Sequence, residues 1–141
     1  MNGLSAFMAQ NAIKPEEIEF IASKRFVQDG KPIPWRIKPI SSDMDEELRK
    51  SCTRKVPVPG KKNVFIPETD YQRYLCKLAV ACTVFPDLND KELQDSYGVM
   101  GAEALLKRML LPGELTDYIA KIQEINGFDL DMQDLVDDVK N

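Results

Sequence analysis

The chain has 141 residues, of which 43% are apolar and 30% charged, and its formal net charge is −4. A chain of this size and balance forms a single globular domain with a real core, which argues against long disorder. No apolar run approaches the roughly 18 residues that a membrane span needs, and the first residues lack a secretion signal, so we expect a cytoplasmic protein without membrane contact.

The N-terminal residues predict a short helix. Leu4, Phe7 and Met8 recur at roughly helical spacing, which indicates an amphipathic helix over residues 3–11 that ends before Pro15. Its apolar face makes it a candidate docking arm.

The next segment predicts a β-hairpin. Apolar and polar residues alternate over residues 17–27 and again over 33–37, and an Asp29-Gly30 turn lies between the two runs. Prolines cannot donate to a strand ladder, so the second strand is expected at a sheet edge. The prolines concerned are Pro32, Pro34 and Pro39.

A helix is predicted from Ser42, with acidic residues in its first turn and basic residues in its last, as the helix dipole favours. The following prolines and glycine predict a loop or short strand over residues 56–67. Residues 49–62 carry six cations and no acid, which is the best argument for nucleic-acid contact. Because no aromatic residues interleave these cations and the whole chain is acidic, a solvent-facing or partner-facing loop is favoured.

The helical part, residues 68–141, is predicted to contain a broad apolar helix from Tyr71 to Phe85 against which the later helices pack. Three shorter helices are expected between Phe85 and Phe128, separated by Gly98 and by Pro112-Gly113. Residues 129–141 predict a final amphipathic helix with an acidic face. The expected fold is α+β and helix-dominated: one domain over residues 1–141, with an N-terminal β-hairpin followed by a bundle of about five helices.

Charge is distributed unevenly along the chain. Residues 1–62 hold 12 Lys/Arg against 8 Asp/Glu, whereas residues 63–141 hold 7 against 15. Such asymmetry favours head-to-tail self-association, the steering of a charged partner, or attraction between two layers of one fold, and the last interpretation is the most ordinary.

The residue types exclude the commonest catalytic centres. The sequence has no histidine, so Ser-His and Cys-His centres are ruled out and only less common lysine or carboxylate arrangements remain. Cys52, Cys76 and Cys82 are poorly spaced for zinc and are expected as reduced thiols. We therefore expect no catalytic residue, no metal, no cofactor and no enzyme activity.

Residues 85–128 carry an ordered series of short motifs: PDLND, LQDSYGV, a GAE-initiated leucine-rich helix, MLLPGE and a terminal INGF. In this order and spacing they resemble the XkdN-like family of phage tail assembly chaperones. A weaker likeness in PWRIKPIS and DYQRYL extends the resemblance over most of the chain. The residues that carry it are Pro86, Asp87, Leu88, Leu93, Gln94, Tyr97, Gly98, Leu105, Leu106, Leu110, Pro112, Gly113, Glu114, Gly127 and Phe128.

This resemblance implies a non-enzymatic chaperone in the cytoplasm of the bacterial host. Such a protein binds the phage tape measure protein, keeps it soluble, promotes assembly of tail tube subunits around it, and is absent from the mature virion. Two alternatives remain open: a minor structural tail protein retained in the particle, and a small nucleic-acid-binding regulatory module.

Surplus apolar groups near the helix ends are the candidates for client contact, with no nucleic acid or membrane as partner. Each of them also has the more ordinary interpretation of a core residue. The six candidates are Met100, Leu106, Met109, Leu111, Tyr118 and Phe128.

Overall fold

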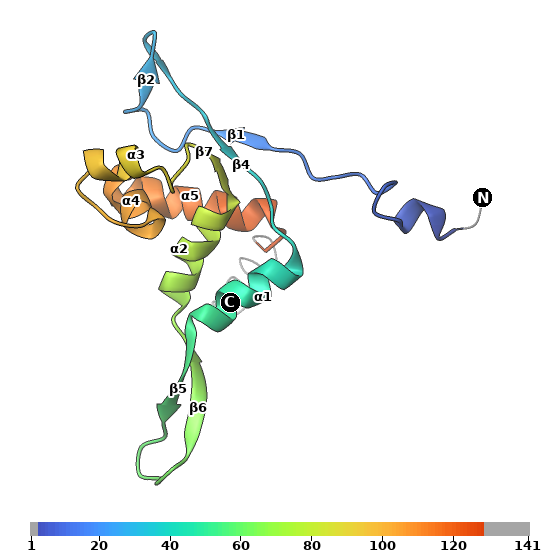
Figure 1. The fold of residues 1–141 in the computed structure, drawn as a ribbon, viewed down its shortest axis with the longest axis vertical. Helices are drawn as coiled ribbons and strands as arrows, with labels where there is room; N and C mark the ends of the chain where they lie inside the picture. Colours follow the sequence, from blue (N-terminus) through green and yellow to red (C-terminus); the bar gives the residue numbers. More distant parts are fainter. Residues whose placement is uncertain (1–2, 129–141) are drawn as a thin grey trace, which may run out of the picture.

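The fold is described here from a computed structural model that covers residues 3–128. A helical body carries a three-stranded sheet on one side, and thin segments of the chain project from it (Figure 1). The strands are β1 (Ile18–Phe20), β2 (Val27–Gln28), β3 (Lys31–Pro32), β4 (Trp35–Ile37), β5 (Thr53–Pro57), β6 (Phe65–Thr69) and β7 (Thr83–Phe85). The helices are the 3-10 turn η1 (Ser5–Phe7) and α1 (Ser42–Ser51), α2 (Tyr71–Cys82), α3 (Lys91–Ser96), α4 (Ala102–Met109) and α5 (Pro112–Ile125).

The main sheet has the strand order β1-β4-β7, and both pairings are antiparallel. Ile18 pairs with Ile37 and Phe20 with Trp35, so these apolar side chains share one face and pack on the helices. The prediction that the Trp35 strand lies at a sheet edge is wrong, because β4 is the central strand. The prolines that suggested an edge all lie outside β4, so none removes a donor from its ladder.

The predicted turn at Asp29-Gly30 is confirmed. It joins β2 to β3, and both turn residues have positive φ, at 53° and 78°, which aspartate tolerates and glycine favours. The two long predicted strands are broken into short pieces, since the chain leaves the main sheet after Phe20 and returns at Trp35.

Helix α2 is the central helix, as its broad apolar stripe predicted. It contacts α1, α4, α5 and β7, and five of its residues are buried. Asp70 caps its N-terminus by accepting a hydrogen bond from the backbone N–H of Arg73 at 3.1 Å. The helix ends at Cys82, earlier than predicted, and the next three residues form β7.

Short motifs set the geometry of the last three helices. The Gln94 amide of α3 donates to the Leu88 carbonyl at 2.9 Å and accepts from the Gly101 N–H at 3.0 Å, which holds the turn before α4. Helix α5 begins directly at Pro112, a residue suited to the first helical position. Gly127 ends it with a φ of 84° and donates to Glu124, while Phe128 donates to Gln123, which is a Schellman motif.

The core forms where the sheet meets these helices. Trp35, Leu78, Leu105, Tyr118 and Ile122 are all essentially inaccessible to solvent. The rings of Trp35 and Tyr118 pack edge to face with centroids 5.2 Å apart, so β4 is held directly against α5.

The predicted order of an N-terminal hairpin followed by a helical bundle is wrong. Strands occur along most of the described chain: a hairpin lies between α1 and α2, and β7 lies between α2 and α3. Prolines in residues 56–67 made that segment look like a loop or a single short strand, and residues 83–85 looked like the end of a helix.

The N-terminal helix is also corrected, because only the three-residue turn η1 forms there. The helix predicted over residues 129–141 lies outside the described residues.

Candidate partner-binding surfaces

The six residues predicted to contact a client divide into three groups. Leu106, Met109 and Tyr118 are buried in the core. Phe128 is half-buried and packs against that core. Met100 and Leu111 are 92% and 55% exposed, so only these two present most of the side chain to solvent. Client contact stays a prediction for all six.

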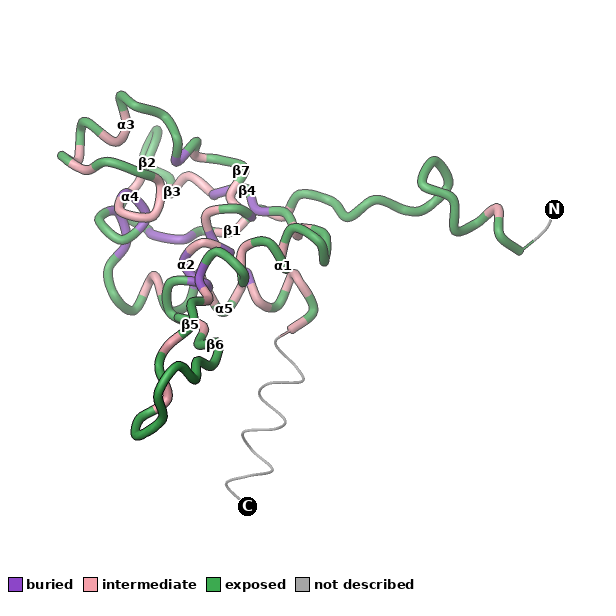
Figure 2. The backbone as a smooth tube through the Cα atoms, turned by 60° about the horizontal axis from the view of Figure 1, so that its bottom comes forward, coloured by how far each residue is buried: buried purple, intermediate pink, exposed green. Residues whose placement is uncertain are grey.

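A larger exposed surface lies on the hairpin of β5 and β6, residues 53–69, which we call the basic hairpin. It projects well beyond the body, away from the main sheet (Figure 1), and Figure 2 shows exposed or half-buried residues along its length. Its five paired positions run from Thr53 opposite Thr69 to Pro57 opposite Phe65. The hydroxyls of Thr53 and Thr69 lie 2.7 Å apart and close its base.

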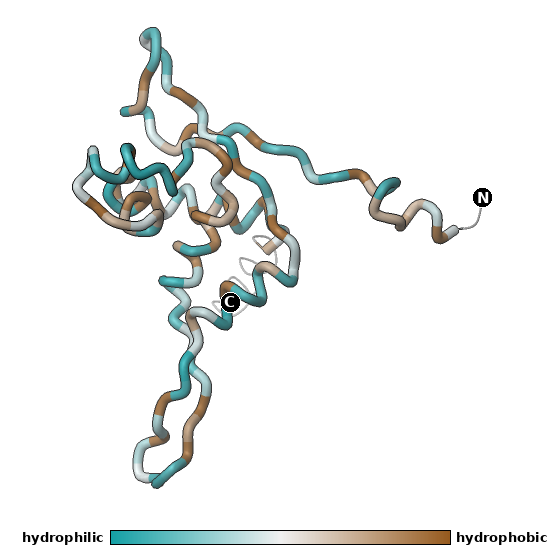
Figure 3. Tube along the Cα trace, viewed as in Figure 1, coloured by the Kyte–Doolittle hydropathy of each residue, from teal (hydrophilic) through white to brown (hydrophobic). Residues whose placement is uncertain are grey.

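The register assigns the side chains of the basic hairpin to two faces, because residues opposite each other in antiparallel strands share a face. Val56 lies opposite Ile66, and the Val58 N–H donates to the Val64 carbonyl at 2.9 Å, which continues the ladder. These four residues, Val56, Val58, Val64 and Ile66, form what we call the aliphatic face. Figure 3 shows apolar residues on both strands of the hairpin. Phe65 and Pro57 belong to the opposite face.

Both edges of the basic hairpin carry a proline. Two backbone hydrogen bonds, from the Val58 N–H to the Val64 carbonyl and from the Asp70 N–H to the Cys52 carbonyl, show that the backbone groups of these residues point toward the partner strand. Every second residue along each strand has the same orientation. Residues 57 and 67 are intervening residues, so an N–H at either position would point away from the partner strand. Pro57 and Pro67 therefore interrupt the outward donors of the two edges without weakening the hairpin itself.

Four cations lie on the basic hairpin: Arg54, Lys55, Lys61 and Lys62, against the single acid Glu68. Among the described residues none of these cations forms an ion pair. The hairpin thus has a free positive charge, unlike the acidic chain as a whole.

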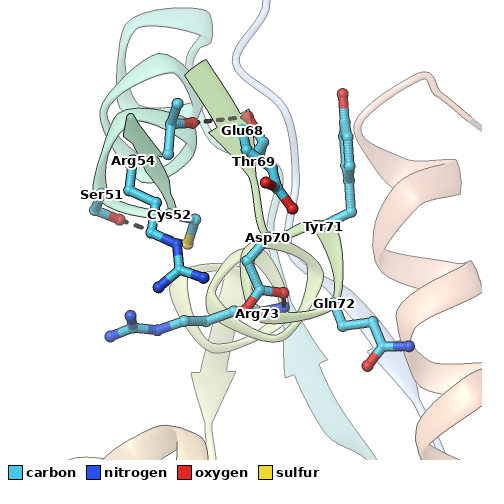
Figure 4. Close-up of a pocket in the computed structure, with 10 residues that line it drawn as sticks. Ser51, Cys52, Arg54, Glu68, Thr69, Asp70, Tyr71, Gln72 and Arg73 are labelled. Atoms are coloured by element: carbon cyan, nitrogen blue, oxygen red, sulfur yellow. Dashed lines mark hydrogen bonds between the residues drawn. The ribbon is translucent and has the colours of Figure 1, made fainter. Parts of the chain in front are cut away.

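A polar pocket of about 480 Å³ lies where the basic hairpin joins α2. Arg54 and Arg73 line it and extend toward the same side in Figure 4, while Asp70 is engaged in capping the helix. Glu68 also lines the pocket, so its two cations are balanced by two acids.

A second, more apolar pocket of about 380 Å³ lies between the ends of α1, α2 and α5. The Arg49 guanidinium lies 4.9 Å from the ring centroid of Tyr74 and 5.9 Å from that of Phe128, so it stacks between them. The Tyr74 hydroxyl donates to Asp45, and burial together with that bond raises the pKa of Tyr74 to about 12. Arg49 is therefore committed to the fold and is not a free cation.

The N-terminal arm, residues 3–17, leaves the body beside β1 and extends away from it (Figures 1 and 2). Leu4, Phe7 and Ile13 are largely exposed on it, with Ile13 at 98%. At the end of the arm, Glu17 forms an ion pair with Arg36 of β4 at 3.3 Å. The arm is a second uncovered apolar element, and its role as a docking arm stays a prediction.

Sequence reasoning did not find the aliphatic face. The signal was present: apolar residues recur at positions 56 and 58 and again at 64 and 66, on either side of a Pro59-Gly60 turn. The prolines obscured this signal because proline is unfavourable in most strands. Only the strand register shows that Pro57 and Pro67 lie where an N–H would point away from the partner strand.

The chain matches the phage XkdN-like tail assembly chaperone family over residues 4–140, and it belongs to that family. It is 37% identical over 140 residues to the phage-like element PBSX protein XkdN of Bacillus subtilis (strain 168), covering 98% of this chain and 93% of that protein. Protein YqbN of the same organism is 39% identical, with the same coverage. The crystal structure of a protein YqbN superposes with a TM-score of 0.76 at 35% identity, covering 92% of this chain and 99% of that one. No helix within residues 3–128 is both long and apolar enough to cross a bilayer.

Proposed function

We propose that this member of the tail assembly chaperone family binds the tape measure protein of its phage. It keeps that long client soluble in the cytoplasm of the bacterial host, promotes the assembly of tube subunits around it, and leaves before the virion is complete. Membership of a chaperone family, which is not an enzyme family, supports this proposal.

The observation that carries the proposal is apolar surface left uncovered outside the core. Exposed apolar side chains gather on two projecting elements, the basic hairpin and the N-terminal arm. Isolated exposed apolar residues are normal on a protein surface, but a contiguous group on an extended element is typical of an interaction site. A chaperone of this kind needs such a surface, because it holds its client by contacts rather than by chemistry.

The test is co-expression with the tape measure protein encoded by the same phage. We expect the tape measure protein to be insoluble alone, and soluble and co-purified with this chain when both are present. A tape measure protein that stays insoluble, or that is soluble without any association, would contradict the proposal.

Mass spectrometry of purified virions separates this function from that of a minor tail protein, since a chaperone should be absent from finished particles. Stoichiometric recovery of the chain in virions would favour the structural alternative.

The four free cations of the basic hairpin favour one second candidate, a nucleic-acid-binding module. Such binding would weaken steeply with salt in an electrophoretic or fluorescence titration, because phosphate contacts release counterions. The aliphatic face has no aromatic side chain on which a base would stack, so we rank this candidate second.

A further inference from the structure

The basic hairpin combines three features that nothing else in the described chain shares. It has an aliphatic face that lies outside the core, half-buried at Val56 and Val58 and exposed at Val64 and Ile66. Its edges are interrupted by prolines, and its cations form no ion pair within residues 3–128. From these we infer that its aliphatic face is the client contact, and that it receives an amphipathic helix with acidic residues at one end of its apolar stripe. This inference rests on the proposed function and adds the binding element and the chemistry of what it binds.

The two edges of the basic hairpin limit the shape of the partner. An extended segment would join the hairpin through its edges, which requires a continuous row of outward N–H and C=O groups. Pro57 on one edge and Pro67 on the other remove donors from those rows. The edges therefore disfavour strand addition, and the remaining apolar surface for contact is a face.

The spacing of the apolar pairs on the aliphatic face matches that of a helix. The pair Val56 and Ile66 and the pair Val58 and Val64 lie two residues apart along the strands, which corresponds to about 7 Å. Apolar residues at i and i+4 of a helix are about 6 Å apart along its axis. Successive apolar side chains along one stripe of a helix can therefore lie over successive apolar pairs of the hairpin, as in ordinary packing of a helix on a sheet.

The charged residues near the aliphatic face bear on the charge of the partner. Arg54 is on the same face as Val56, opposite Glu68, and Lys61 and Lys62 lie in the loop at the tip of the hairpin. At the other end Arg54 and Arg73 line the pocket beside α2 together with Glu68 and Asp70, so the two cations there are balanced by two acids. The excess positive charge therefore lies at the tip of the hairpin, where it complements acidic residues at one end of a bound apolar stripe.

The chemistry of the face also favours a polypeptide over a nucleic acid. Its side chains are β-branched and aliphatic, whereas the hairpin's one aromatic residue, Phe65, lies on the opposite face. Single-stranded nucleic acids need aromatic surfaces for stacking in addition to positive charge.

The experiment compares two neighbouring residues. Ile66→Ser removes an apolar group from the aliphatic face, and Phe65→Ser removes one of similar exposure, 55% against 51%, from the opposite face. Binding of the full chain to the purified tape measure protein of the same phage is measured by titration calorimetry. Neither residue belongs to the core, so both variants should retain the circular dichroism spectrum and melting temperature of the wild type.

We expect Ile66→Ser to weaken binding by about tenfold or more and Phe65→Ser to change it by less than about threefold, since the energy of an interface is concentrated in a few central apolar residues. The double variant Lys61→Glu and Lys62→Glu should slow association and reduce its dependence on salt. Equal affinity of Ile66→Ser and wild type would overturn the inference while leaving the proposed function standing.

Other outcomes also decide the matter. If the wild-type chain does not bind the tape measure protein, the proposed function fails and the inference fails with it. If a DNA duplex or an RNA binds the hairpin, and this binding is lost on reversal of Lys61 and Lys62 but kept in Ile66→Ser, the face is not the functional element and the inference is overturned.

Discussion

The side chain of Arg25 donates a hydrogen bond to the carboxylate of Glu114 at 3.0 Å, although 89 positions separate the two residues in sequence. The same guanidinium donates to the Met109 carbonyl, and the Glu114 carboxylate accepts from the Leu111 N–H at 2.8 Å. One ion pair thus joins the segment after β1 to the α4–α5 junction and completes the N-terminal cap of α5.

The first prediction concerns the pH dependence of this junction. Hydrogen bonds from Ser23 and the Leu111 N–H, together with Arg25, lower the pKa of Glu114 from 4.5 to about 2. A lowered folded-state pKa means that the carboxylate stabilises the fold fully above pH 4.5 and that this contribution is lost as the pH falls toward 2. Glu114→Gln should therefore lower the melting temperature at pH 7, as the loss of a helix cap does.

The gap in melting temperature between wild type and Glu114→Gln should narrow as the pH is lowered from 4.5 to 2, which a thermal scan at each pH measures. A gap that stays constant over this range would show that the charge of Glu114 does not contribute. Glu16→Gln, at an exposed position outside any helix or strand, is the control and should leave the melting temperature close to that of the wild type.

The second prediction concerns the buried hydroxyl of Tyr118, which lies 2.5 Å from the Thr83 hydroxyl and links α5 to the end of α2. Burial raises the pKa of Tyr118, so the ring stays neutral. Tyr118→Phe should lower the free energy of unfolding by about 0.5–1.5 kcal/mol, the net value of one such hydrogen bond. Urea denaturation measures this, and Tyr71→Phe, at an exposed position of α2, should be neutral. Equal effects of the two substitutions would contradict the structure.

The third prediction separates core from surface among the candidate client residues. Met109→Asp places a carboxylate in the core and should cost at least about 2–5 kcal/mol, the range for truncating a buried methionine, and in addition the cost of burying the charge. Met100→Asp makes the same change at a residue that is 92% exposed and should leave the circular dichroism spectrum and melting temperature intact. A folded Met109→Asp variant with native stability would contradict this placement.

The fourth prediction concerns thiol reactivity. All three cysteines are buried and unpaired, and burial raises the pKa of the Cys76 and Cys82 thiols. Because the thiolate is the reactive form, the native protein should react slowly with a disulfide reagent at pH 8, and all three thiols should react rapidly in denaturant. Fast labelling of the native protein would show that the core opens readily.

Sequence reasoning located α1 and the last three described helices well, because their start and end signals were local. The Asn126-Gly127 pair predicted the end of α5, and Gly98 and Pro112 predicted the limits of the helices on either side of them. Side chains and backbone within a few residues decide such boundaries, so a single sequence contains the information. The motifs of residues 85–128 likewise indicated the family that the whole-chain comparison confirmed.

Local patterns were less informative about strands. Residues 83–85 continue the apolar stripe of α2 in sequence, but in the structure they pair with β4 across more than forty positions. The prolines near Trp35 suggested an edge strand, yet that strand is central because its two partners come from distant segments. A strand is stabilised by the partner that it meets, and the chain near it does not reveal that partner.

By itself the sequence determined the limits of the last three described helices, the family, and the absence of histidine chemistry, because these depend on residue identity and short-range spacing. Only the tertiary structure decided which apolar residues are covered. Met109 and Leu111 are two positions apart and similarly apolar, yet Met109 is buried in the core and the Leu111 side chain is 55% exposed. Burial depends on which distant elements pack over a side chain, and the same dependence left the aliphatic face of the basic hairpin uncovered.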